Sequence, residues 1–203
     1  MPVGIVQRVC GGEGIEIDSM VPLSLMEEAW KNSRKAIFRL EIIPEYNVPE
    51  DVILFENGKQ GKFEFDADAR KWLHNLKSTK ERNVNIQRVR VVPLPFPEYI
   101  KYEIEFWKHS IPNGEEIFFL ESKEYENIIK NLDFEPKDFW LFDDEILIIF
   151  HYDETGNFVK EKLISNEEMI KKHAELKKEL LKRAIPMEEF LKKNLTSSRH
   201  ANH

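Results

Sequence analysis

The stretch that most constrains the fold is residues 138–164, where three apolar runs alternate with two acidic turns. The first run ends at the turn Asp143-Asp144, the second covers residues 146–150, and the third covers residues 158–164. Connections this short join antiparallel neighbours, because a parallel crossover needs about a dozen residues or more. The segment therefore predicts a C-terminal three-strand antiparallel meander. Its middle strand is apolar on both faces and should be central and covered.

The remaining chain predicts further strands and helices around this meander. Strands are predicted at residues 36–42, 52–55, 86–92 and 116–120. Helices are predicted from Asp66 to about residue 80, after the prolines at 93–97, over residues 123–132 and from Asn166 to about residue 184, followed by a short turn at 187–191. This order predicts an α+β fold with a mostly antiparallel sheet and helices packed mainly on one face.

Length and composition predict one folded domain with short extensions. The chain has 203 residues, and its apolar content of 41% is enough to bury a core. Residues 1–20 look separate, because a strand-like run is followed by three glycines between positions 11 and 14. The glycine spacing fits neither phosphate-binding loop template, which favours a turn. We expect an N-terminal extension over residues 1–20, a single α+β domain over 21–194 and a frayed tail over 195–203.

Several classes of protein are excluded by composition. A single cysteine, Cys10, excludes a disulfide framework and a cysteine-rich zinc site. No apolar run could span a bilayer and no signal-peptide core is present, so we expect a cytoplasmic protein without a membrane partner. The net charge of −7 argues against a general nucleic-acid coat. No cofactor and no metal are expected, because the carboxylates of Asp143, Asp144 and Asp153 are explained by turn chemistry.

Four motifs spread along the chain resemble one bacterial family. They are Phe-Arg-Leu-Glu at residues 38–41, Arg-Val-Arg-Val-Val at 88–92, Tyr-Ile-Lys-Tyr-Glu at 99–103 and Asp-Phe-Trp-Leu-Phe-Asp-Asp at 138–144. Together, over residues 22–191, they resemble an uncharacterised, actinobacteria-rich family of domains of unknown function. Members of that family are often encoded beside XRE-type helix-turn-helix regulators. The resemblance implies a regulatory or toxin–antitoxin-like context with a helix-turn-helix partner, and no recognised catalytic signature.

Three arginines form the main polar constellation. Arg88 and Arg90 lie two positions apart on one predicted strand and so share a face, and Arg39 lies on the polar face of its own strand. Such guanidiniums can clamp a phosphate-bearing ligand in bidentate fashion. The alternative, which we favour, is that they form structural ion pairs. Acidic partners are available at Glu41, Glu103 and Glu105.

Acid–base chemistry has three candidate residues: Glu103, His151 and Asp153. His151 lies near the end of the central strand, where Asp153 could orient it, although a core histidine is the simpler interpretation. The chain has no Ser or Cys nucleophile motif and no H-E-x-x-H, which disfavours a hydrolytic triad. Tyr99 and Tyr102 are the remaining candidate binding residues, because tyrosines exposed beside Arg88 would form a base-stacking platform.

Two functions from different classes follow. The first is a regulatory or toxin–antitoxin-like interaction protein that works with a helix-turn-helix partner. The second is a nucleotide- or RNA-acting enzyme with an arginine phosphate clamp and Glu103 or His151 as acid or base. An enzyme needs a concave site where such side chains converge. Whether Arg88, Arg90 and Glu103 line a cavity or pair in a packed interface separates the two.

Overall fold

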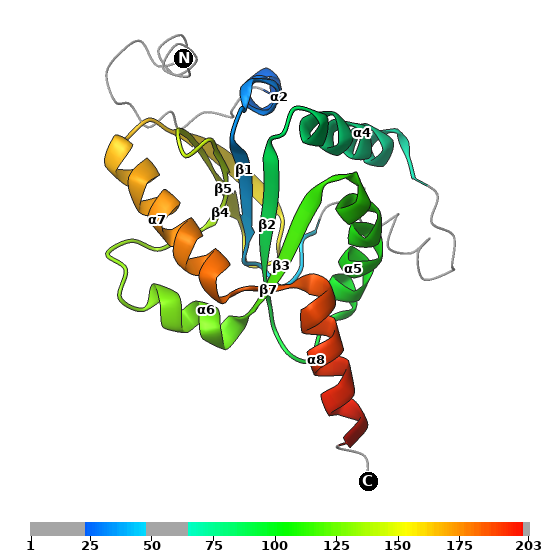
Figure 1. The fold of residues 1–203 in the computed structure, drawn as a ribbon. Coiled ribbons are helices and arrows are strands. Elements are labelled where there is room, and N and C mark those ends of the chain that lie inside the picture. Colours follow the sequence, from blue (N-terminus) through cyan, green and yellow to red (C-terminus); the bar gives the residue numbers. More distant parts are fainter. Residues whose placement is uncertain (1–22, 48–64, 201–203) are drawn as a thin grey trace.

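A seven-stranded sheet forms the centre of the molecule, in the order β6-β5-β4-β1-β2-β3-β7 (Figure 1). The computed structural model describes residues 23–47 and 65–200, with side chains over residues 25–47 and 65–194. The strands are β1 (Ala36–Glu41), β2 (Asn85–Val92), β3 (Glu115–Glu121), β4 (Asp138–Phe142), β5 (Ile146–Tyr152), β6 (Phe158–Ile164) and β7 (Ile185–Pro186). Four of the six neighbouring pairs are antiparallel, which confirms the mostly antiparallel sheet.

The centre of the sheet is parallel, which the sequence analysis did not anticipate. β1 pairs in parallel with β2, and β2 in parallel with β3. The connections run through α4 (Ala67–Glu81) and α5 (Glu98–Ser110), which is followed by a 3-10 turn at Ile111–Asn113. A helix of this length can carry the chain back to the start of the next strand, as a parallel pair requires. The C-terminal strands β4, β5 and β6 are successive antiparallel neighbours.

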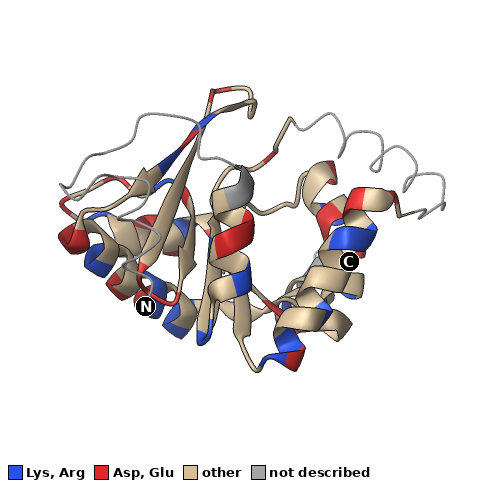
Figure 2. Cartoon of the chain, turned by 90° about the horizontal axis from the view of Figure 1, so that it is seen from above, with Lys and Arg blue, Asp and Glu red and all other residues tan. Residues whose placement is uncertain are grey.

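Helices cover both faces of the sheet, so the expectation that they pack mainly on one face is wrong. On one face, α6 (Ser122–Ile129) and α7 (Glu167–Arg183) pack against the core that contains Phe38 and Phe139. On the other face, α2 (Leu23–Asn32), α4, α5 and α8 (Met187–His200) pack against side chains such as Ile37 and Phe119. Figure 2 shows the sheet edge-on between these layers. Residues of β1 and β2 that point to opposite layers are buried alike along most of each strand, and both faces therefore need cover.

Two predicted helix starts are built as the sequence suggests. Asp66 caps α4 by accepting a hydrogen bond from the Ala69 amide at 2.7 Å, and Asn166 caps α7 by accepting one from the Met169 amide at 2.9 Å. Side-chain acceptors at these positions satisfy amides that the first helical turn leaves unpaired. These caps fix where α4 begins beside the sheet, which matters for the site described below.

The C-terminal region differs from the expected short turn at residues 187–191. Ile185 and Pro186 form a short strand beside β3. It is the edge of the sheet within the part of the chain that the structure describes, and an edge strand tolerates proline, which has no N–H to donate. α8 then begins at Met187 and runs to His200, past the start of the tail expected at residue 195. The expected extension at residues 1–20 and the strand at 52–55 lie outside the described residues.

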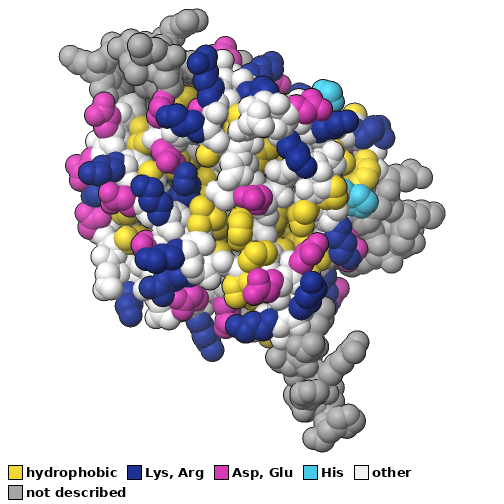
Figure 3. Space-filling model, in the orientation of Figure 1, with side chains coloured by type: hydrophobic (Ala, Val, Ile, Leu, Met, Phe, Trp, Pro, Cys, Tyr) yellow, Lys and Arg dark blue, Asp and Glu magenta, His cyan; other side chains and the backbone are white. Residues whose placement is uncertain are grey.

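Positive and negative side chains are interspersed on the face that carries α7, and apolar side chains gather nearer its centre (Figure 3). Exposed ion pairs join α7 to neighbouring segments, as between Lys172 and Asp133 at 2.6 Å and between Arg183 and Glu124 at 2.6 Å. Pairs of this kind contribute little to stability individually. Among the described residues, no helix has the length and apolarity needed to cross a membrane.

Candidate functional site

A cavity of about 360 Å³ lies where α4 and α5 meet the sheet. The strands contribute polar side chains from β1 and β2 and aromatic ones from β4 and β5, while the two helices contribute aromatic and acidic side chains. The lining residues are Arg39, Glu41, Tyr46, Asp66, Asp68, Ala69, Trp72, Arg88, Tyr99, Tyr102, Glu103, Phe106, Trp107, Trp140 and Tyr152. Its volume falls at the small end of sites that hold a small organic ligand.

Strand register explains why charged side chains meet beneath this cavity. In the parallel pairing of β1 and β2, Arg39 lies opposite Arg88 and Glu41 lies opposite Arg90. Residues two apart on a strand point to the same face, so the four side chains form one patch. All four are buried, with at most 8% of each residue exposed.

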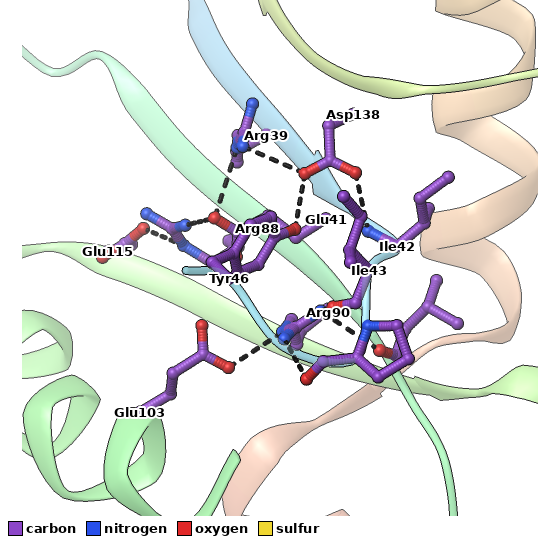
Figure 4. A network of polar contacts seen from close by, with 12 residues as sticks. Arg39, Glu41, Ile42, Ile43, Tyr46, Arg88, Arg90, Glu103, Glu115 and Asp138 are labelled. Carbon is purple, nitrogen blue, oxygen red and sulfur yellow. Dashed lines mark hydrogen bonds and ion pairs between the residues drawn. The ribbon is translucent and has the colours of Figure 1, made fainter. Parts of the chain in front are cut away.

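Carboxylates bind Arg39 and Arg88 in this patch (Figure 4). Arg39 lies 3.3 Å from Glu41 and 3.1 Å from Asp138, measured between nitrogen and oxygen. Arg88 donates to Glu115 at 2.7 Å and also to Glu41, which therefore bridges the two arginines. The favoured interpretation of structural ion pairs describes this geometry, and Glu41 is one of the partners that the sequence analysis named.

Arg90 closes the network on the side away from the cavity. It is completely buried and donates to Glu103 at 3.0 Å. Its remaining nitrogens donate to the carbonyls of Ile43 and Pro44, just beyond β1. Glu103 is thus the expected partner of Arg90. The expectation that Glu105 is a third partner of the arginines is wrong. Glu105 lies on the exposed side of α5 and pairs with Lys108 at 2.5 Å.

Aromatic rings cover the flat faces of both guanidiniums that line the cavity. The guanidinium carbon of Arg39 is 4.7 Å from the ring centre of Phe150 and 5.4 Å from that of Trp140. The guanidinium carbon of Arg88 lies within 5.9 Å of three indole rings, those of Trp72, Trp107 and Trp140. Each cation is therefore held by carboxylates at its edge and by rings at its faces.

The arginines hold Glu41 ionised, whereas Glu103 titrates near neutral pH. Burial alone would raise the pKa of Glu41, but Arg88, Arg39 and Arg90 surround it and lower that pKa to about 2. Burial raises the pKa of Glu103 to about 8, even though Arg90 acts in the opposite direction. Burial therefore brings the pKa of this lining carboxyl close to physiological pH.

The sequence did not point to three residues of the network as functional residues: Tyr46, Asp138 and Glu115. Asp138 accepts hydrogen bonds from the Tyr46 hydroxyl and, at 3.0 Å, from the Ile42 amide, and Glu115 holds Arg88. Burial raises the pKa of both carboxyls against the pull of the neighbouring arginines. Asp138 and Glu115 are the first residues of β4 and β3. A charged residue at the start of an apolar run is the sequence signal that could have identified them.

Two buried atoms that belong to cavity-lining side chains have no hydrogen-bond partner. They are Oε2 of Glu41 and Nη1 of Arg39. An unsatisfied buried polar group is unfavourable and is uncommon in folded proteins. Glu41 Oε2 thus remains an unused acceptor in a side chain that otherwise binds two arginines.

The predicted residues separate into those that the cavity brings together and those that it does not. Glu103 lines the cavity, but His151 is half-buried on β5 opposite Lys160 and is not part of the lining. Asp153 is exposed and accepts hydrogen bonds from Thr155 and Asn157 in its own turn, which lowers its pKa to about 2. His151 and Asp153 therefore lie outside the candidate site.

The expected stacking platform of tyrosines needs a second correction. Tyr99 and Tyr102 line the cavity with Arg88, but Tyr102 is only 8% exposed, so they form a wall and not an open platform. The carboxylate of Asp143 does not serve its own turn as expected, because it accepts hydrogen bonds from the amides of residues 34–36, where the chain enters β1. Within the described ranges, no group of three His, Cys, Asp or Glu side chains is placed to hold a metal ion.

Comparisons with known proteins give a family without an activity. The model of a domain of unknown function, DUF6879, matches residues 25–192. No curated protein matches the chain. Among solved structures, the crystal structure of a phospholipase D family member, Nuc from Salmonella typhimurium, aligns with a TM-score of 0.47 and 8% sequence identity, covering 86% of this chain and 95% of that chain. A likeness this low carries no conclusion about function.

Proposed function

The chain belongs to the DUF6879 family of domains of unknown function, and we propose that it binds a small organic molecule in the cavity between α4, α5 and the sheet. The observation that carries this proposal is the convergence of eight aromatic side chains with buried charged groups around one space. Cavities that bind small molecules combine apolar walls with a few fixed polar groups in this way. The network below fixes those groups before any ligand arrives.

A regulatory role is the second part of this proposal. The resemblance over residues 22–191 implies a toxin–antitoxin-like setting with a helix-turn-helix partner, and the family match over residues 25–192 supports the recognition of an uncharacterised family. Ligand binding would then change how the protein interacts with that partner. Affinity between the two purified proteins, measured with and without ligand, tests the idea. Equal affinity in both conditions contradicts it.

Tryptophan fluorescence tests ligand binding directly, because Trp72, Trp107 and Trp140 line the cavity. We expect some members of a mixed-charge library of small aromatic compounds to change the emission in a saturable way. The variant Ala69→Phe, which places a ring into the lining, should abolish the change. Its control is Ala67→Phe, two residues earlier on the same helix, exposed and outside the lining. If no compound binds, or if Ala69→Phe binds as well as wild type, the proposal is wrong.

A specific observation favours an enzyme as the second candidate. Glu103 lines the cavity, and burial raises its pKa to about 8, which suits a general acid or base at neutral pH. The nucleotide- or RNA-acting interpretation also needs arginines available for phosphate, and the carboxylates on Arg39 and Arg88 weigh against that part. Nucleotide and RNA hydrolysis by wild type, and its loss in Glu103→Gln, would establish the enzyme. Equal rates in both proteins would contradict it.

A further inference from the structure

We propose that the molecule bound by this cavity is an organic cation: a protonated or quaternary amine on a small aromatic body. This inference rests on the proposed function and names the chemical class of its ligand. Three properties of the cavity lead to it. They are the balance of charges in the lining, the carboxylates and rings that already contact the guanidiniums, and a carboxylate oxygen without a hydrogen bond.

The charges in the lining favour a positive ligand. Four carboxylates, those of Glu41, Asp66, Asp68 and Glu103, stand against the two guanidiniums of Arg39 and Arg88. Asp66, the N-cap of α4, and Asp68, in its first turn, are exposed, so they add negative charge to the solvent-facing part of the lining. Charge of one sign in a cleft with low-dielectric walls attracts the opposite charge.

The guanidiniums are already committed within the protein. Arg88 binds Glu41 and Glu115 and lies under three indole rings. Arg39 binds Glu41 and Asp138 and is covered by Trp140 and Phe150. Each of these guanidiniums keeps one terminal nitrogen outside the hydrogen bonds to carboxylates: Nη1 of Arg39, which is buried, and Nη2 of Arg88. A fork-like phosphate or carboxylate clamp uses two nitrogens of one guanidinium. Such a clamp on either arginine would therefore have to displace a buried carboxylate.

The lining offers a cation the acceptor groups that it needs. Oε2 of Glu41 is a buried carboxylate oxygen without a hydrogen bond, and an ammonium that reaches the floor of the cavity supplies the missing donor. Glu103 uses one oxygen for Arg90, and when it is ionised its carboxylate adds a second negative group on the α5 side. The tyrosine and tryptophan side chains of the lining supply aromatic surface against which the ring of such a ligand can pack.

Three compounds with the same ring but different charge test the inference. Tyramine carries an ammonium, 4-hydroxyphenylacetamide is neutral, and 4-hydroxyphenylacetate is an anion. Dissociation constants at pH 8 are measured by tryptophan fluorescence and calorimetry on the full chain. We expect tyramine to bind about tenfold more tightly than the amide, because ring and carboxylate contacts add to its affinity, and the anion to bind most weakly.

Variants assign that preference to the lining. Glu103→Gln keeps the size of the side chain but removes its charge, and should reduce the preference for tyramine. Because this change also touches Arg90, Asp68→Asn on the exposed turn of α4 serves as a second variant that leaves the buried network intact. Glu105→Gln is the matched control, since Glu105 faces away from the cavity and pairs with Lys108. Both lining variants should weaken tyramine binding while amide binding stays unchanged.

The possible results separate this inference from the proposed function. Equal binding of the three compounds, or tighter binding of the anion, overturns the cation assignment but leaves a cavity that binds small molecules. A preference for tyramine that survives in both Glu103→Gln and Asp68→Asn also overturns it. Failure of all three compounds overturns the cation assignment as well. The proposed function itself fails only if the whole mixed-charge library gives no signal that Ala69→Phe removes.

Discussion

Arg88 should be the most costly of the cavity arginines to remove. The variant Arg88→Ala leaves Glu115 without its ion-pair partner and leaves Glu41 with Arg39 alone, 3.3 Å away. Both carboxyls are buried, Glu115 to 1% and Glu41 to 8% of residue exposure. Breaking a buried pair in this way costs about 3–5 kcal/mol in free energy of unfolding. For a domain of this size, that corresponds to a fall in Tm of about 6–20 °C.

Urea unfolding followed by far-ultraviolet circular dichroism measures this change. Arg183→Ala is the matched control, because it breaks an exposed pair with Glu124 and should cost about 0–1 kcal/mol. The loss in Arg88→Ala should also shrink as pH falls, since an unpaired Glu115 can then be neutralised by a proton. If Arg88→Ala unfolds within about 1 kcal/mol of wild type, the network is not structural and the reasoning is refuted.

Three further changes have defined outcomes. Ile148→Asp should prevent folding, because Ile148 is completely buried in β5, the middle strand of the meander, and the new charge would have no partner; a soluble variant with the wild-type Tm contradicts this. Gly156→Ala should cost about 1–3 kcal/mol in urea unfolding, because Gly156 has a φ of +79° and an added Cβ would lie 2.4 Å from the Glu45 carbonyl oxygen. An unchanged midpoint contradicts the expected strain. Calorimetry with benzyltrimethylammonium, whose charge is permanent, should show affinity rising as pH increases through about 8, where Glu103 loses its proton beside Arg90, Arg88 and Glu41. Glu103→Gln should flatten that profile, and an equal slope in both proteins refutes the assignment.

Features set by neighbouring residues could be predicted from the sequence. The caps at Asp66 and Asn166 depend on one side chain and the first turn of its own helix. The shared face of Arg88 and Arg90 follows from the two-residue period of a strand. Asp143 shapes the turn between β4 and β5 with a φ of +54°, which aspartate tolerates better than most residues.

Features set by strand order could not be predicted in the same way. The alternation within β1 and β2 gives each strand two faces, but it does not say which strand lies beside which. Glu115 reaches Arg88 because β3 pairs with β2, and Asp138 reaches Arg39 because β4 pairs with β1. The βαβ order was nevertheless readable, since a helix separates β1 from β2 and another separates β2 from β3. The helices that connect these parallel strands, α4 and α5, lie on a face of the sheet that the expected one-face arrangement leaves without helices.

The cavity and the network beneath it form one electrostatic unit with an unequal count of charges. Three guanidiniums, on Arg39, Arg88 and Arg90, meet four carboxyls, on Glu41, Glu103, Glu115 and Asp138. With all of them ionised, the buried unit has one negative charge in excess, which is unfavourable in a medium of low dielectric constant. A proton removes that excess, and the pKa of Glu103 near 8 marks it as a group that can hold the proton at neutral pH. Because Glu103 also lines the cavity, a bound cation would take over the role of that proton. The excess of negative charge, which is unfavourable for the buried network by itself, therefore favours the binding of a positive charge.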